Sequence, residues 1–267
     1  MRNVHGLRAP STFGAPPPRR NPMFGMAKMH RLAKGLAGLA LALMGVAPRD
    51  AAACGGSGPG GTGGCEFRLD RPREPRIGAS VVATDTTMLF GDGRRAQMER
   101  LATFASLGWP LSRRLTFEAS LGATLGGKLE TPGGTVSLLP GAASAVGLTG
   151  RVLDEGEVAP FVVAGLTLSG STARARDAAR SFEAYDLRAS AIVGKTLART
   201  LAPYVLGRAF GGPAFWRWDD GARVQGTDLH KLQLGAGLAL SLGPVDLFVE
   251  AVPVGERSLA AGFGIRP

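Results

Sequence analysis

This 267-residue sequence is poor in the features that mark several common protein classes. Its two cysteines exclude a disulfide-dense scaffold and a four-cysteine zinc site. After residue 50 no apolar run reaches the length of about 18 residues that a transmembrane helix needs, which excludes a polytopic helical membrane protein. The G-x-S-x-G, H-E-x-x-H and Walker-type motifs are absent as well. Apolar residues nevertheless make up 45% of the chain, so it is not disordered throughout.

The formal net charge of +10 is unevenly distributed along the chain. Residues 1–53 hold eight of the 31 basic residues and one of the 21 acidic residues, which leaves 23 basic and 20 acidic residues from Cys54 onward. The basic excess therefore lies mostly in the leader. The later arginines are scattered and form no compact basic patch, so no nucleic-acid partner is expected.

The N-terminal part has the pattern of a secretory signal. Three basic residues (Lys28, Arg31 and Lys34) precede an apolar stretch over Leu36–Val46 and the small residues of Ala51–Ala53. This order predicts a signal peptide that is cleaved near Ala53. We therefore treat residues 1–53 as an N-terminal extension and signal peptide, in which the role of residues 1–25 stays open.

A Gly/Pro-rich segment over residues 54–75 follows and is expected to be a flexible region. Cys54 and Cys65 lie within it and can pair in an oxidising compartment. Lipidation of Cys54 is the alternative, although Ala51 stands where a lipobox usually has Leu. The two cysteines have no histidine near them, so no metal site and no cofactor is predicted.

From Arg76 onward the sequence alternates with period two instead of helical period. In the clearest run, 231–242, leucines occupy one face and Lys, Gln, Gly and Ser most of the other. Many runs are 10–16 residues long, enough for tilted membrane strands, which need about 9–11 residues. The pattern predicts an all-β, antiparallel, up-and-down transmembrane barrel of ten strands over 76–267, with a count of eight left open. The runs are 76–90, 100–111, 115–130, 141–153, 159–174, 182–197, 201–218, 229–242, 245–254 and 257–266.

The connections between these runs alternate in predicted length. Short links such as 112–114 follow the even-numbered runs. Longer, more polar links follow most of the odd-numbered runs: 91–99, 131–140, 175–181 and 219–228. Outer-membrane barrels combine short periplasmic turns with longer outer loops in this way. An even number of strands then puts both termini on the periplasmic side.

Over residues 76–267 the chain resembles the small outer-membrane β-barrel proteins of Gram-negative bacteria. The resemblance rests on the signal peptide, the alternating runs, the loop asymmetry and the final strand SLAAGFGIRP. It implies an outer-membrane location, with outer-membrane lipid and the barrel assembly machinery as partners, and it leaves the oligomeric state open. The chain departs from the family at its end, because Ile265-Arg266-Pro267 stands where such proteins usually have an aromatic residue.

Charged residues on the barrel strands are predicted to line the lumen, because an Arg or Lys on the lipid face near the midplane costs about 2–4 kcal/mol. These candidates are Glu118, Asp186, Arg188, Arg208, Lys231, Asp246 and Glu250. Aromatic residues near predicted strand ends are expected to form two interfacial girdles. These are Trp109, Phe117, Phe161, Tyr204, Trp216, Trp218 and Phe263.

The sequence points to a structural or passive small-pore role without evident catalysis. A soluble secreted β-barrel that binds a small apolar ligand is one alternative. An outer-membrane hydrolase using His230 is another, because Asp228-Leu229-His230 resembles part of the omptin protease site. Omptins add an acidic pair on the second outer loop, whereas the corresponding segment here, TPGGTVSLLP, has no acidic residue.

Overall fold

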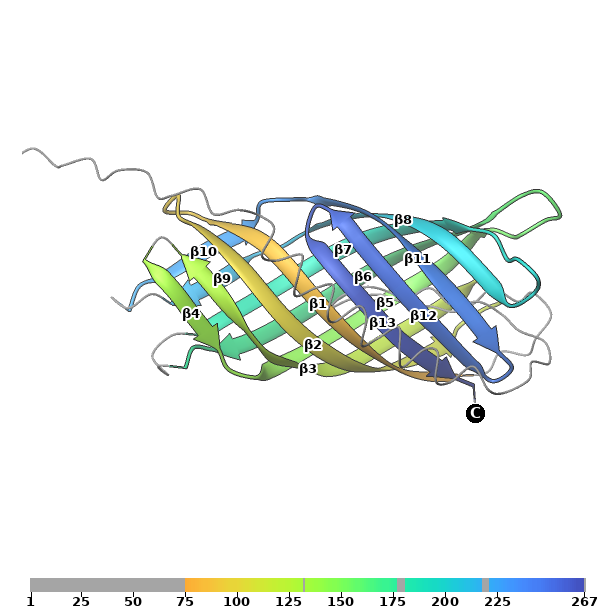
Figure 1. Ribbon diagram of the computed structural model, residues 1–267, viewed down its shortest axis with the longest axis horizontal. Coiled ribbons are helices and arrows are strands. Elements are labelled where there is room, and N and C mark those ends of the chain that lie inside the picture. The colour runs from red at the N-terminus through yellow and green to blue at the C-terminus, as the bar shows by residue number, and fades with distance from the viewer. Residues whose placement is uncertain (1–74, 132, 177–180, 218–220, 267) are drawn as a thin grey trace, which may run out of the picture. The chain divides into compact units, whose positions relative to one another are not determined.

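The computed structural model describes residues 75–131, 133–176, 181–217 and 221–266. Every regular element in these ranges is a β-strand (Figure 1). None of these residues belongs to a helix long and apolar enough to cross a membrane. The predicted signal peptide, the flexible segment, the pairing of Cys54 with Cys65 and the position of Trp218 lie outside the described residues.

The strands form one antiparallel sheet that closes where β1 pairs with β13. The predicted ten-strand barrel is confirmed, with three of the ten strands divided into two segments each: β4 with β5, β8 with β9, and β10 with β11. The strands are β1 (Arg76–Phe90), β2 (Arg95–Pro110), β3 (Leu115–Thr131), β4 (Gly134–Leu138), β5 (Gly141–Leu153), β6 (Phe161–Arg174), β7 (Ser181–Gly194), β8 (Leu201–Gly211), β9 (Ala214–Arg217), β10 (Arg223–Asp228), β11 (Leu232–Leu242), β12 (Val245–Val254) and β13 (Arg257–Ile265).

The predicted asymmetry of the loops is wrong, because strands continue through the expected long loops. Only residues 91–94 connect β1 to β2, and Glu99 pairs with Asp85 in the ladder. Likewise β4 forms a hairpin with β3 inside the expected loop 131–140. These segments still alternate, with Met98 buried and Gln97 exposed, so they continue the barrel wall.

The number of strands in the wall changes along the barrel. The β12–β13 hairpin turns at Gly255 and Glu256, well short of β9 and β10 (Figure 1). Beyond that turn β1 pairs directly with β10, with Met88 opposite Asp228. We call the part that includes β8, β11, β12 and β13 the ten-strand section. The part beyond it, built from β1, β2, β3, β4, β6, β7, β9 and β10, is the eight-strand section.

Two sets of apolar side chains fill the barrel. The ten-strand layer consists of two buried clusters that both pack against Phe248: Phe161, Val163, Ile192, Ala202, Tyr204, Leu206, Ala239 and Val252, and Val82, Ala102, Phe104, Ala143 and Ala260. The eight-strand layer consists of Met88, Phe90, Ala96, Met98, Leu129, Leu138, Ala173, Ala175, Phe182, Ala214 and Trp216. Gly237 makes room for this packing, because a Cβ there would lie 2.2 Å from Cζ of Tyr204.

The outer face of the wall changes character between the two sections. In the ten-strand section large apolar side chains are exposed, including Leu121, Leu148, Leu166, Leu187, Val205, Leu232, Leu234, Leu238 and Phe263. In the eight-strand section the outer face carries ion pairs. Nζ of Lys128 lies 3.0 Å from Glu99 and 2.9 Å from Glu130, and Arg223 lies 2.8 Å from Glu183. Apolar and charged groups therefore exchange sides between the two sections.

Candidate functional site

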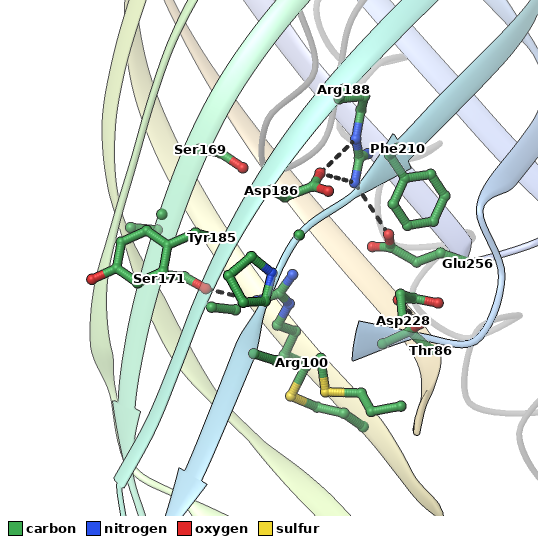
Figure 2. A pocket seen from close by; sticks show the side chains of 18 of the residues that line it. Thr86, Arg100, Ser169, Ser171, Tyr185, Asp186, Arg188, Phe210, Asp228 and Glu256 are labelled. Carbon is green, nitrogen blue, oxygen red and sulfur yellow. Dashed lines mark hydrogen bonds and ion pairs between the residues drawn. The ribbon is translucent and has the colours of Figure 1, made fainter. Parts of the chain in front are cut away.

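A layer of charged side chains lies inside the barrel between the two apolar layers. Five of them line a cavity of about 50 Å³ (Figure 2): Arg100 on β2, Asp186 and Arg188 on β7, Asp228 at the end of β10, and Glu256 in the β12–β13 turn. Strand alternation positions Asp186 and Arg188, which occupy the same face of β7. Thr86, Ser169 and Ser171 add hydroxyl-bearing side chains to the lining.

Arg188 binds the turn of the last hairpin, β12–β13, through Glu256, and so keeps that turn within the barrel wall. Its Nη2 lies 3.0 Å from Oδ2 of Asp186 and 3.2 Å from Oε2 of Glu256 (Figure 2). The guanidinium also stacks 4.7 Å from the ring centroid of Phe210. Gln233 Nε2 donates to the backbone carbonyl of Glu256 at 3.1 Å, which fixes the turn from a second side.

Two further groups of buried charges lie deeper in the ten-strand section. Nη2 of Arg208 donates to both carboxylate oxygens of Glu250, at 2.8 and 2.9 Å, and both side chains are almost fully buried. Asp246 is also buried and accepts from Arg76 at 3.1 Å and from Arg266 at 3.3 Å. In this way Asp186, Arg188, Arg208, Asp246 and Glu250, all predicted to face the lumen, lie within the barrel.

The other two predicted lumen residues differ from each other. Glu118 is partly buried and accepts from the hydroxyl of Thr149 at 3.1 Å. Lys231 corrects the prediction, because its side chain is exposed and bonds to Oγ1 of Thr227 instead of lining the interior. The cause is the break between β10 and β11, which interrupts the alternation on which the prediction depended.

Arg100 is the arginine of this layer that has no ionic partner. Its Nε donates to Oγ1 of Thr84 at 3.2 Å, and its Nη1 donates to Oγ of Ser171 at 3.0 Å. Among the described residues no carboxylate lies within ion-pair distance of its guanidinium. By contrast, Arg188 has two carboxylate partners and Arg208 has one.

Asp228 is engaged in a turn. One carboxylate oxygen accepts from the backbone N–H of His230 at 3.0 Å, and the other accepts from the hydroxyl of Thr86. Both oxygens therefore have partners other than the imidazole of His230, which is exposed. The Asp-x-His spacing that resembles part of the omptin site belongs here to a turn between β10 and β11.

The predicted aromatic girdles are present only in part. Trp109, Phe117 and Phe263 are exposed on the outer face, at 53%, 38% and 44%. The prediction is wrong for Phe161, Tyr204 and Trp216, because all three side chains are buried inside the barrel. Their position near a strand end was the basis of the prediction, but the face of the strand decides whether a side chain points outward.

Sequence reasoning missed Arg100 and Glu256 as members of the charged layer. The signal for Arg100 was available, because it shares a strand face with Met98, Ala102 and Phe104, all of which are buried. Glu256 lies in a two-residue turn, where alternation gives no information about direction.

No protein-family model matches the sequence, and no curated protein matches it. The chain is similar to solved structures of outer-membrane proteins at low identity. For the translocator domain of the autotransporter NalP from Neisseria meningitidis, identity is 13% and the TM-score 0.40, over 92% of this chain and 98% of that one. For the outer membrane protein OprG from Pseudomonas aeruginosa, the sequence identity is 11% and the TM-score is 0.43. The match covers 74% of this chain and 98% of OprG. For the transport unit of the autotransporter AIDA-I from Escherichia coli, the sequence identity is 9% and the TM-score is 0.39. The match covers 74% of this chain and 91% of that transport unit.

Proposed function

We propose that this protein is an integral outer-membrane β-barrel with a sealed interior. Its role is structural, and it does not act as an open passive pore. The ten-strand section supports membrane insertion, because leucine and valine side chains cover its outer face while its charges lie inside. This is the arrangement that lipid requires. The eight-strand section then projects into water, with ion pairs such as Arg223–Glu183 on its outer face.

The observation that carries the sealed interior is the filling of both sections by apolar side chains. The ten-strand layer draws residues from nine of the ten strands, all except β3, and Phe248 connects its two clusters. Residues from all eight strands of the eight-strand section contribute to or pack against the eight-strand layer. Barrels of about eight strands are just wide enough for side chains to fill the interior.

A soluble barrel that binds an apolar ligand is less well supported. Such a protein would place its leucines around an internal cavity and polar groups outside. Here Leu232, Leu234 and Leu238 are exposed on the outer face, while their neighbours Gln233 and Ala239 are buried.

Membrane fractionation and planar-bilayer recording test the proposal. We expect the protein in the outer membrane, with a gel mobility that shifts on boiling, and no steady conductance after reconstitution. Recovery in the soluble periplasm would overturn the membrane assignment, and steady ion conductance of the wild type would overturn the sealed interior.

The two apolar layers lie in series, so opening one of them leaves the other closed. We expect Phe248→Ala and Trp216→Ala each to stay non-conducting, and the double variant to conduct ions. Conductance in either single variant would show that only one layer acts as a seal. Leu238→Ala on the outer face is the matched control and should not conduct, either alone or combined with one of the two single variants.

A further inference from the structure

The cavity between the two apolar layers contains one cation and one carboxylate without ionic partners. Arg100 is held by the hydroxyls of Thr84 and Ser171, and Asp228 by the hydroxyl of Thr86 and the amide of His230. Charges inside a protein are normally paired or hydrogen-bonded to a counter-charge, because desolvation is costly. Figure 2 shows both side chains at the cavity, together with the paired Arg188.

The two unpaired groups approach the same strand, β1, from its two neighbours: Arg100 belongs to β2 and Asp228 to β10. Thr84 and Thr86, which bind Arg100 and Asp228 respectively, occupy the same buried face of β1. Residues two apart in a strand are separated by about 6.6 Å. A small molecule between the two charges could therefore bond to both at once.

The charge of the cavity favours a ligand with both signs. Two arginines face three carboxylates in the lining, a formal charge of −1. A simple anion at Arg100 would enter this negative surrounding, and a simple cation at Asp228 would lie near the unpaired guanidinium. A molecule that carries an ammonium and a carboxylate satisfies Asp228 and Arg100 together and leaves the net charge unchanged.

The position and size of the cavity point to a small polar ligand from water. Its level along the barrel is given by Thr84, which pairs with Arg100, and by the next residue, Asp85, which lies on the outer face opposite Glu99. The outer face has therefore turned polar at this level. A volume of about 50 Å³ is several times the roughly 10–15 Å³ that one water molecule needs, and it holds only a few heavy atoms.

We propose that the cavity is a binding site for a small zwitterion, in which Arg100 binds a carboxylate and Asp228 binds an ammonium group separated from it by a short carbon chain. Ser169 and Ser171 supply hydroxyls beside the carboxylate. Entry of a zwitterion requires only one apolar layer to open transiently, whereas steady conductance requires both to be open, so the titration and the bilayer recording can fail separately.

Calorimetric titration of the purified full-length barrel tests the site, with glycine, β-alanine, γ-aminobutyrate and ε-aminohexanoate as a series of increasing charge separation. We expect binding of the shorter members and its loss for ε-aminohexanoate. Acetate and methylammonium, which each carry one charge, should bind at least about tenfold more weakly than the best zwitterion. A folded wild-type barrel that binds no member of the series overturns the proposal.

Two variants assign the roles of the two residues. Arg100→Gln and Asp228→Asn are each expected to weaken binding of the best zwitterion by about tenfold or more. Arg95→Gln, on the same strand but exposed, is the control and should bind like the wild type. If Arg100→Gln does not fold, as judged by its boiling-dependent mobility, Arg100→Lys keeps the charge and Asp228→Asn still decides. Binding of acetate as tight as glycine, and unchanged in Asp228→Asn, would overturn the zwitterion site in favour of a plain anion site.

Discussion

The two sections of this barrel are built with opposite polarity. In the ten-strand section leucines cover the outside and the ion pairs Arg208–Glu250 and Arg76–Asp246 lie inside. In the eight-strand section the interior is apolar, and the pairs Arg223–Glu183 and Lys128–Glu99 lie outside. The first arrangement suits lipid and the second suits water. The same strands serve both, because a β-strand offers one face to each side along its whole length.

The last hairpin accounts for the difference between the two interiors. Adding β12 and β13 widens the barrel, and this hairpin supplies Asp246, Glu250 and Glu256, which pair with arginines from other strands. Arginine side chains in the ten-strand section span one or two intervening strands to reach these carboxylates, whereas the narrower section is filled by apolar side chains, the largest of them Phe, Met, Leu and Trp. The buried ion pairs are therefore found where the barrel has ten strands and its cross-section is wider.

The largest effect is expected from removing one charge of the deepest ion pair. Glu250→Gln leaves the guanidinium of Arg208 buried without a charged partner, which should lower the free energy of unfolding by about 3–5 kcal/mol. Urea titration of the reconstituted barrel measures this loss. A loss below about 1 kcal/mol would mean that water replaces the carboxylate, and that the ten-strand interior is wet at this level.

Two glycines allow the β12–β13 turn, which lies within the barrel wall, to be compared with the β1–β2 turn at the end of the barrel. Gly255 has a φ of +88°, and a Cβ there would lie 1.9 Å from the carbonyl oxygen of Leu232. Gly93 has a φ of +81°, with nothing within 4 Å of such a Cβ. Gly255→Ala combines backbone strain with overpacking and should cost about 2–5 kcal/mol, while Gly93→Ala should cost about 1–2 kcal/mol. Equal losses in urea titrations would show that the hairpin turn is not packed into the wall.

Much of the fold follows from alternation in the sequence, but not the change in strand number. The period-two runs predict ten strands and the outward leucines of β11 correctly. The alternative count of eight also describes part of the molecule, because β12 and β13 end early. The sequence does not mark this end, since pairing between β1 and β10 depends on register across more than a hundred residues.

The interior could have been predicted better from the same signal. Tyr204 and Arg208 lie four residues apart on one strand and must share a face, so an inward Arg208 implies an inward Tyr204. Placing Tyr204 in an outer girdle conflicts with that rule. The partners of each charge were beyond reach, because Arg188 meets Glu256 only through closure of the whole barrel.

An arginine on the outer face distinguishes the two sections directly. Leu238→Arg in the ten-strand section should cost about 2–4 kcal/mol in a lipid bilayer, because the charge enters the apolar region. Thr135→Arg, on exposed β4 of the eight-strand section, should change the free energy of unfolding by less than about 0.5 kcal/mol. Equal effects for the two variants would place both sections in the same solvent.

The smallest effect is expected from an ion pair on the outside of the eight-strand section. Glu183 and Arg223 lie 2.8 Å apart but are largely exposed, so Glu183→Gln should cost at most about 1 kcal/mol. The same carboxylate-to-amide change at Glu250 is expected to cost several times more, which makes the two variants a matched pair. Raising the salt concentration should remove most of the Glu183 effect and little of the Glu250 effect, because exposed pairs are screened and buried pairs are not. A large, salt-independent loss in Glu183→Gln would mean that this outer face is shielded from water, and the division of the barrel into a lipid-facing and a water-facing section would have to be abandoned.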